Sequence, residues 1–284
     1  MGKSLDPTIA LFAKLPVPGG VKTRLQPKVG RAGSARLAAA MLVDRLKFVD
    51  ELKNDTAHGK LLCGDRSEVT PFLPYLAQAW GQPLWRGRIN SGQGEVPGSN
   101  WYYRSQGSGG LGQRIFRVLQ DYRQGGCIVI GTDAVAQNLE VLKDALKILG
   151  EGRSVIQPAK DGGFTLLGLP AGNPAEGWNP LEAVLSADGT GGLSSSAISW
   201  GGVSAALTKS GWPPQVLEQE VDVDEWSDVE SLIDSSAESP GSVAFMTQFL
   251  QELSFIPKDV WRVPVEMPIL RAGEATPTAP AEKE

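Results

Sequence analysis

The sequence predicts an α/β fold with a mostly parallel central sheet and helices on both faces. Short apolar runs, which are typical of buried strands, alternate along the chain with segments whose apolar residues recur at helical spacing. Such alternation favours a three-layer arrangement in which helices connect parallel strands. The length of 284 residues also allows a large buried core that needs no disulfide or metal to stabilise it.

The strands are expected where apolar runs end in turn residues. The first is TIALFA at residues 8–13, which leads into a Lys/Pro/Gly loop, and the clearest is CIVIGTD at 127–133. The others are expected at 60–63, 101–106, 154–158, 164–170 and 215–224, the last of which runs into an acidic loop. Ligands of open parallel sheets bind at the carboxyl ends of the strands, so the loops that follow these strands are the candidate functional segments.

The helices are expected between the strands. Residues 31–52 place Ala38, Leu42, Leu46 and Val49 on one stripe, which predicts a long amphipathic helix. Further helices are expected at 71–80, 111–123, 138–149, 193–209 and 226–234, whereas 81–100 are expected to form a loop. We expect three parts of the chain: a main domain at 1–235, a helical extension at 236–270, and a disordered Pro/Ala/Glu-rich tail at 271–284.

Composition excludes several classes of protein. The chain is 41% hydrophobic and 21% charged, and no apolar run approaches the roughly 18 residues of a membrane helix. Its two cysteines, Cys63 and Cys127, lie in expected buried strands, which argues against a disulfide framework and for a cytoplasmic protein. The single histidine, His58, excludes a His-rich metal centre and is expected in a solvated loop.

The net charge of −5 is unevenly distributed. Residues 1–66 carry twelve Lys/Arg and six Asp/Glu, whereas residues 216–284 carry four and fifteen. A basic segment inside an acidic protein indicates a local anionic ligand, such as a small molecule that bears phosphate, rather than a nucleic acid. We therefore expect no nucleic-acid partner and no membrane partner.

Two glycine-containing loops are candidates for binding that ligand. The loop at 14–24 follows the first strand, and its Lys22 and Arg24 are suited to phosphate oxygens, although a solvated basic loop is an alternative. Its spacing is not that of a Walker A loop. The second loop, 107–112, matches G-x-G-x-x-G between an expected strand and helix, which leaves a dinucleotide site as an alternative.

Four aspartates are candidates for the chemistry. Asp133 ends the clearest strand, where it would hold Mg²⁺ or Mn²⁺ against a diphosphate or cap the next helix. Asp161 would face a substrate or simply belong to a hairpin turn. Asp222 and Asp224 alternate along an extended segment, so both carboxylates would face one cation or begin an acidic helix.

Taken together, these segments resemble the bacterial DUF2064 family of the GT-A, nucleotide-diphospho-sugar transferase superfamily. The resemblance rests on five motifs in the correct order over residues 8–234. They are FAKLPVPGGVKTRL at 12–25, QGSGGLGQR at 106–114, IGTD at 130–133, PAKDGGFTLLGL at 158–169 and DVD at 222–224. The resemblance implies a Rossmann-like GT-A three-layer sandwich, with residues 1–235 as its nucleotide-binding domain.

The resemblance also implies roles for individual residues. Asp133 and Asp161 are expected to be catalytic, and Asp133, Asp222 and Asp224 are expected to hold Mg²⁺ or Mn²⁺. The residues expected to bind nucleotide or phosphate are Lys14, Gly19, Lys22, Thr23, Arg24, Gly109, Gly112, Gly162 and Gly163. The expected activity is a metal-dependent transfer from a nucleotide-diphospho-sugar to an unidentified small-molecule acceptor.

Departures from the family pattern keep two alternatives open. The family continues its IGTD motif with Ser-Pro, where this chain has Ala134 and Val135, and it has Asp where this chain has Gly110. One alternative is a nucleotidyltransferase that releases pyrophosphate from a nucleoside triphosphate, which the Lys22-Thr23-Arg24 opening favours. The other is a non-catalytic nucleotide-binding protein with a thinned metal site.

Overall fold

The computed structural model of the chain describes residues 6–52, 59–67, 71, 93–95, 101–187 and 198–236. Within these ranges it contains an eight-stranded sheet of strand order β3-β4-β2-β1-β5-β7-β6-β8. Several predictions lie outside the described residues. They are the helix at 71–80 (except residue 71), the extension at 236–270 (except residue 236), the tail at 271–284 and the loop position of His58.

The sheet is mostly parallel, as predicted. Its strands are β1 (Thr8–Ala13), β2 (Gly59–Gly64), β3 (Gln93–Glu95), β4 (Trp101–Ser105), β5 (Cys127–Gly131), β6 (Val155–Pro158), β7 (Phe164–Leu169) and β8 (Gln215–Val216). β1 pairs in parallel with β2 and β5, β2 with β4, and β6 with β8. β7 is antiparallel to β5 and β6, and β3 is antiparallel to β4.

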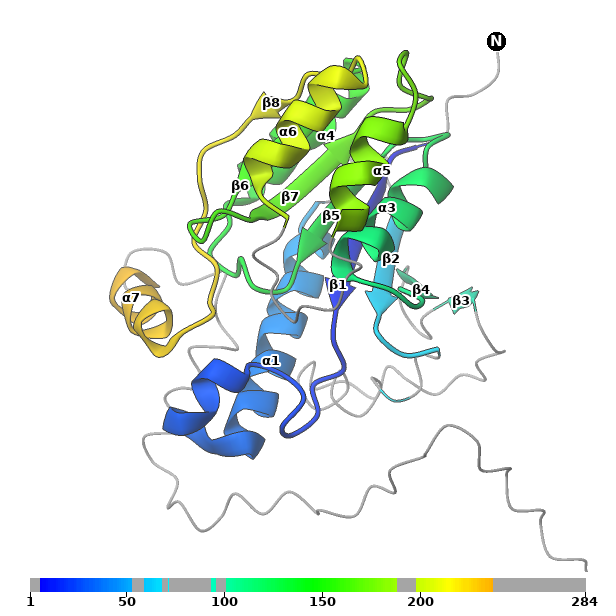
Figure 1. Ribbon diagram of the computed structural model, residues 1–284. Coiled ribbons are helices and arrows are strands. Elements are labelled where there is room, and N and C mark those ends of the chain that lie inside the picture. Colours follow the sequence, from blue (N-terminus) through cyan, green and yellow to red (C-terminus); the bar gives the residue numbers. More distant parts are fainter. Residues whose placement is uncertain are drawn as a thin grey trace, which may run out of the picture.

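Helices cover both faces of the sheet (Figure 1). They are α1 (Gln26–Asp50), α3 (Leu111–Asp121), α4 (Leu139–Gly150), α5 (Asn179–Ser186), α6 (Trp200–Lys209) and α7 (Trp226–Ser236), with a 3₁₀ turn, η1 (Thr23–Leu25), before α1. Alternate residues of β1 separate the two faces: Ile9 and Leu11 belong to the core with α1 and α4, whereas Ala10 and Phe12 belong to the core with α3, α5 and α6. The predicted three-layer sandwich is confirmed.

A third hydrophobic cluster anchors the acidic segment after β8. It joins Leu37 and Met41 of α1 to Val229 of α7, and it includes Val223 from the segment between β8 and α7. Figure 1 shows α7 beside α1 and apart from the sheet. The cluster therefore holds residues 222–224 near the first turns of the chain, although some 200 residues separate them in sequence.

Some elements differ from the sequence prediction. Gly30, with φ 74° and ψ 172°, interrupts α1, so the long helix begins as a short helical segment before residue 31. β3 forms within the expected loop at 81–100 because its backbone pairs with β4. The predicted strand at 215–224 has only two strand residues, and the helix expected at 193–209 begins at Trp200, where the Ser199 hydroxyl accepts the N–H of Gly202.

Cys63 and Cys127 are buried and free, as predicted. Burial raises the pKa of the Cys63 thiol to about 12, so this thiol is uncharged at neutral pH. Of the helices in the described ranges, none has the length and apolar character needed to cross a membrane.

Candidate functional site

Four segments meet at the carboxyl edge of the sheet. β1, β5 and β6 end there at Ala13, Gly131 and Pro158, and the antiparallel β7 starts there at Phe164. The loops at 14–22 and 132–138 and the hairpin turn at 159–163 therefore leave the same edge. Residues 217–220 run beside β6 toward it, because Leu217 N donates to Ile156 O and Glu220 N to Pro158 O, each over 2.9 Å.

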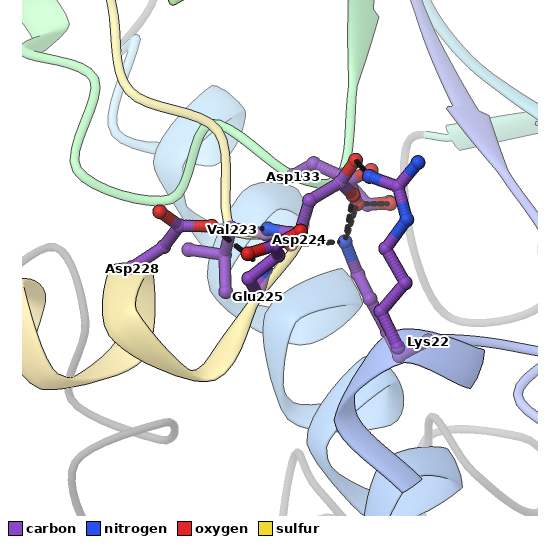
Figure 2. Close-up of polar contacts among 8 residues, drawn as sticks. Lys22, Asp133, Val223, Asp224, Glu225 and Asp228 are labelled. Carbon is purple, nitrogen blue, oxygen red and sulfur yellow. Dashed lines mark hydrogen bonds and ion pairs between the residues drawn. The ribbon is translucent and has the colours of Figure 1, made fainter. Parts of the chain in front are cut away.

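Lys22 lies at the centre of this edge. Its ammonium is 2.9 Å from Asp133 Oδ1 and 3.4 Å from Asp224 Oδ1, and it donates a short hydrogen bond to the carbonyl of Val223 (Figure 2). Only 9% of its side chain is exposed. The first loop and the turn that carries Asp133 therefore meet at this edge.

The backbone of Lys22 is strained. Its φ of 46° and ψ of 47° are left-handed, and among the described residues other than glycine it alone has a positive φ. This conformation costs an L-residue on the order of 1 kcal/mol, and strain of this kind persists where the surroundings over-determine it. The two carboxylates and the carbonyl that hold the ammonium provide that restraint.

Arg24 extends the positive charge toward solvent. Its Nη1 lies 3.1 Å from Asp224 Oδ2, and 64% of its side chain is exposed. Exposed ion pairs contribute little to stability, so this guanidinium can exchange its partner for a ligand anion at low cost. Thr23 is also exposed, in the 3₁₀ turn between the two cations.

The segment carrying Asp222 and Asp224 is held from both sides. Val223 N donates to Asp133 O over 3.1 Å, and the buried Val223 side chain points into the third cluster. Asp228 Oδ2 accepts the N–H groups of Asp224 and Glu225 over 3.0 and 2.7 Å (Figure 2). Because Val223 faces the core, its two neighbours Asp222 and Asp224 lie on the opposite side of the segment, where their carboxylates come close to each other.

A group of three carboxylates lies at this edge, and its membership differs from the predicted set. Asp161, Asp222 and Asp224 each bring a carboxylate oxygen within 4.8 Å of the other two. The predicted set contained Asp133 in place of Asp161. Asp133 instead lies against the Lys22 ammonium, which is held between the turn after β5 and the acidic segment. Carboxylate oxygens at these separations suit Mg²⁺ or Mn²⁺.

The charges in this group affect one another. Burial raises the pKa of Asp222 from 3.8 to about 6, with smaller contributions from the negative charges of Asp161, Asp224 and Asp133. A carboxyl with such a pKa is partly protonated in mildly acidic solution. Any bound cation would favour its ionised form, since a nearby positive charge stabilises a carboxylate.

The Asp161 turn is a hairpin between β6 and β7. Gly162 has a φ of 93°, its N–H donates to Ala159 O over 3.1 Å, and its carbonyl accepts Trp200 N over 3.0 Å. Asp161 Oδ1 accepts Gly163 N over 2.8 Å. The backbone donors of Gly162 and Gly163, which were predicted to bind phosphate, are therefore engaged within the turn, and the exposed Asp161 side chain is the group presented to solvent.

The glycine-rich loop at 107–112 has a structural explanation at Gly112. A Cβ at this position would collide with the carbonyl oxygen of Leu185 and lie 2.6 Å from Ile198 Cδ1, so Gly112 allows α3 to approach α5. Gly109, with a φ of 100°, provides a left-handed turn ahead of α3 and remains exposed. Of these two predicted nucleotide-binding glycines, Gly109 alone is accessible to a ligand.

Sequence reasoning missed the residue that fixes this loop. Gln106 is buried, and its Nε2 donates to Ala13 O over 3.0 Å and to Cys63 O over 2.8 Å, which joins the ends of β1 and β2. Arg117 clamps the loop through Gln106 O and Ser108 O, over 2.8 and 2.7 Å. A polar residue at the end of a buried strand was the available signal for Gln106.

The remaining predicted residues of the first loop lie at its outer part. Lys14 is exposed, and the following residue is held because Leu15 N donates to Asp65 Oδ1 over 2.7 Å. Gly19 has a φ of 84° in a turn beside the Arg31 side chain. Lys14 and Gly19 take no part in the ion pairs that Lys22 makes with Asp133 and Asp224.

The sheet order and the helices on both faces define an α/β protein with a mostly parallel sheet between two helical layers. Residues 79–184 match the family model described as "Uncharacterized protein conserved in bacteria (DUF2064)". The matched segment contains three of the five motifs, those at 106–114, 130–133 and 158–169, and it confirms the predicted resemblance over that part of the chain.

The fold is shared with a "putative nucleotide-diphospho-sugar transferase" from Desulfovibrio desulfuricans G20. That crystal structure is 20% identical in sequence, has a TM-score of 0.65, and is matched over 88% of this chain and 96% of its own. Two looser matches are Rv0371c from Mycobacterium tuberculosis H37Rv (14% identity, TM-score 0.41, 82% and 100% coverage) and 4-diphosphocytidyl-2C-methyl-D-erythritol synthase from Anaerococcus prevotii DSM 20548 (12%, 0.42, 88% and 100%). These two carry no argument about function, and no curated protein matches the chain.

Proposed function

We propose that the chain is a metal-dependent GT-A-type transferase that acts on a nucleotide-diphospho-sugar in the cytoplasm. The observation that carries the proposal is the nearly buried ammonium of Lys22, shared by Asp133 and Asp224 at the carboxyl edge of the sheet. An ammonium, an exposed guanidinium and several carboxylates within one edge suit a diphosphate together with a divalent cation.

The residues divide into two binding functions. Lys22 and Arg24 would donate to the diphosphate oxygens, with Lys14 and Thr23 at the outer side of the same loop. Asp222 and Asp224, with Asp133 or Asp161, would hold Mg²⁺ or Mn²⁺. When bound, the cation would supply electrostatic stabilisation of the leaving diphosphate.

The acceptor side of the site would be the hairpin turn. Asp161 is exposed there. It follows β6, whereas the loop with Lys22 follows β1 and the turn with Asp133 follows β5. A carboxylate at this position would orient an acceptor hydroxyl and accept its proton. Asp133 would hold the Lys22 ammonium in place for the diphosphate, since the two side chains form an ion pair.

The test is calorimetric binding of UDP- and GDP-sugars with and without Mn²⁺. The wild type is compared with Asp133→Asn and with a matched control, Asp144→Asn, which changes an exposed aspartate on α4. We expect Mn²⁺-dependent binding in the wild type and the control, and at least a tenfold loss in Asp133→Asn. Binding that is absent or independent of Mn²⁺ in all three proteins would refute the proposal.

A nucleotidyltransferase is the second candidate. Arg24, although paired with Asp224, and Lys14 are both exposed, so they add accessible positive charge to that of Lys22, and a triphosphate would use this additional charge. Pyrophosphate release from GTP, CTP or UTP with a library of phosphorylated metabolites distinguishes this reaction from sugar transfer. Nucleotide binding without turnover in either assay would favour a non-catalytic nucleotide-binding protein instead.

A further inference from the structure

A completely buried arginine lies beneath the turn that carries Asp133. Arg45 comes from the C-terminal part of α1, and its guanidinium stacks over the Phe48 ring with its Cζ 4.1 Å from the ring centroid. Nη1 donates to Ala134 O over 2.9 Å, and Nη2 donates to Gln137 Oε1 over 2.6 Å. One side chain of α1 therefore holds both ends of the turn at 134–137.

The hydrogen bonds continue from this turn into the hairpin that carries Asp161. Gln137 Nε2 donates a short hydrogen bond to Gln157 Oε1, and the Thr165 hydroxyl lies 3.0 Å from the same oxygen. Gln137, Gln157 and Thr165 are all buried. Gln157 lies on β6 and Thr165 on β7, four residues before and four residues after Asp161, so the network spans both arms of the hairpin.

Stability does not explain a charge at this position. Burial lowers the pKa of Arg45 to about 9, although the negative charges of Glu220, Asp133 and Asp44 act in the opposite direction. Its Nε is buried and has no hydrogen-bond partner among the described residues. Replacing buried ionic groups by apolar residues of similar volume is often neutral or stabilising, so the burial of this arginine points to a role in position or specificity.

The first two side chains of the turn, at 134 and 135, provide no polar anchor. Ala134 and Val135 stand where the family pattern has Ser-Pro, and both side chains are apolar and buried. Within the turn, the Ala134 carbonyl accepts Gln137 N over 3.3 Å. Among the described residues, the polar contacts that tie this turn to other elements are those of Arg45 and Gln137, the bond from Val223 N to Asp133 O, and the ion pair of Asp133 with Lys22.

We propose that Arg45 is a positioning residue that, through Gln137 and Gln157, fixes the turn bearing Asp133 relative to the hairpin bearing Asp161. The functional importance of this placement rests on the proposed transferase activity, but the placement itself does not.

Hydrogen exchange in Arg45→Met tests the placement without any ligand. The readouts are the amides of Val223, bonded to Asp133 O, and of Gln137, bonded to Ala134 O. The internal reference is the amides of β5. We expect exchange of Val223 and Gln137 to rise at least tenfold and to exceed any rise in the β5 amides, while the loss of two buried hydrogen bonds lowers the melting temperature. Unchanged exchange at Val223 and Gln137, or an equal rise in β5, would overturn the proposal.

Two further measurements keep the test decisive. Arg45→Lys retains the charge and one donor direction, so it should show the same selective rise in exchange at smaller amplitude. It replaces Arg45→Met if that variant does not fold. Exchange equal to wild type in Arg45→Lys would then count against the proposal. Binding of UDP with Mn²⁺ should weaken about tenfold in Arg45→Met, which corresponds to about 1.4 kcal/mol. A wild type that binds no nucleotide refutes the transferase proposal and leaves the exchange result standing.

Discussion

Replacing Lys22 by methionine should change cation binding and nucleotide binding in opposite directions. In the wild type the ammonium contacts Asp133 and Asp224, so a cation that binds Asp224 must compete with it. Without the ammonium, Mn²⁺ alone should bind about tenfold more tightly. UDP in the presence of saturating Mn²⁺ should bind about 30-fold more weakly, because the lost charge-assisted hydrogen bond is worth about 2 kcal/mol.

The same substitution should destabilise the ligand-free protein only moderately. Hydrogen bonds to charged groups contribute about 1.5–3 kcal/mol, but the Asp133 and Asp224 side chains are 42% and 34% exposed, so solvent screens the pairs. We expect a loss of about 1–2 kcal/mol in the free energy of unfolding. For a chain of this size that corresponds to a melting temperature about 3–6 °C lower.

Two variants make the interpretation specific. Lys22→Gly removes the same charge but adopts the left-handed backbone without strain, so it should be about 1 kcal/mol more stable than Lys22→Met. Lys209→Met changes an exposed lysine at the end of α6 and should leave both affinities and the melting temperature unaltered. If Lys22→Met weakened Mn²⁺ and UDP binding together, or changed neither, the assignment of Lys22 as a cation that exchanges carboxylates for phosphate would be wrong.

Three further predictions follow from the packing and charges of the edge. Burial raises the pKa of Asp222 in the folded state to about 6, so the stability that its protonated form contributes is lost as pH rises through that value. The asparagine in Asp222→Asn does not titrate, so in EDTA the melting temperature of this variant minus that of wild type should grow from pH 4 to pH 7. A difference that stays constant with pH would contradict this. Gly112→Ala should lose about 1–3 kcal/mol in denaturant unfolding because its Cβ meets Leu185 O, whereas Gly201→Ala, in open space on α6, should be neutral or slightly stabilising. Asp228→Ala should lose about 1 kcal/mol and weaken Mn²⁺ binding, since it frees the segment that carries Asp224; an unchanged Mn²⁺ affinity would show that Asp228 does not position it.

Local sequence patterns predicted the elements of the fold well for physical reasons. Apolar runs mark buried strands, and apolar residues at helical spacing mark amphipathic helices. For this reason β1, β5, α3 and α4 lie close to their expected ranges. The Asp-Gly-Gly turn between β6 and β7 also forms the hairpin that its residues indicate. β3 was not predictable, because its strand state depends on pairing with β4 rather than on its own residues.

The candidate site divides along the same line. The residues Lys22, Arg24, Asp133, Asp161, Asp222 and Asp224 were identified from the sequence, because loops that follow parallel strands must share one edge. The residues that each of them contacts were not identified from the sequence. The sequence grouped Asp133 with Asp222 and Asp224, whereas the structure groups Asp161 with them and gives Asp133 to Lys22.

The sequence by itself determined the α/β class, the edge at which charged residues meet, and the sign of the charges there. Only the tertiary structure decided which carboxylate meets which cation, that Gly112 serves helix packing, and that Arg45 lies under the Asp133 turn. The physical reason is the distance along the chain between the residues that interact. Strand and helix periods are local properties of the chain, whereas an ion pair between residues 22 and 224 depends on how α1, β5 and the segment after β8 pack together.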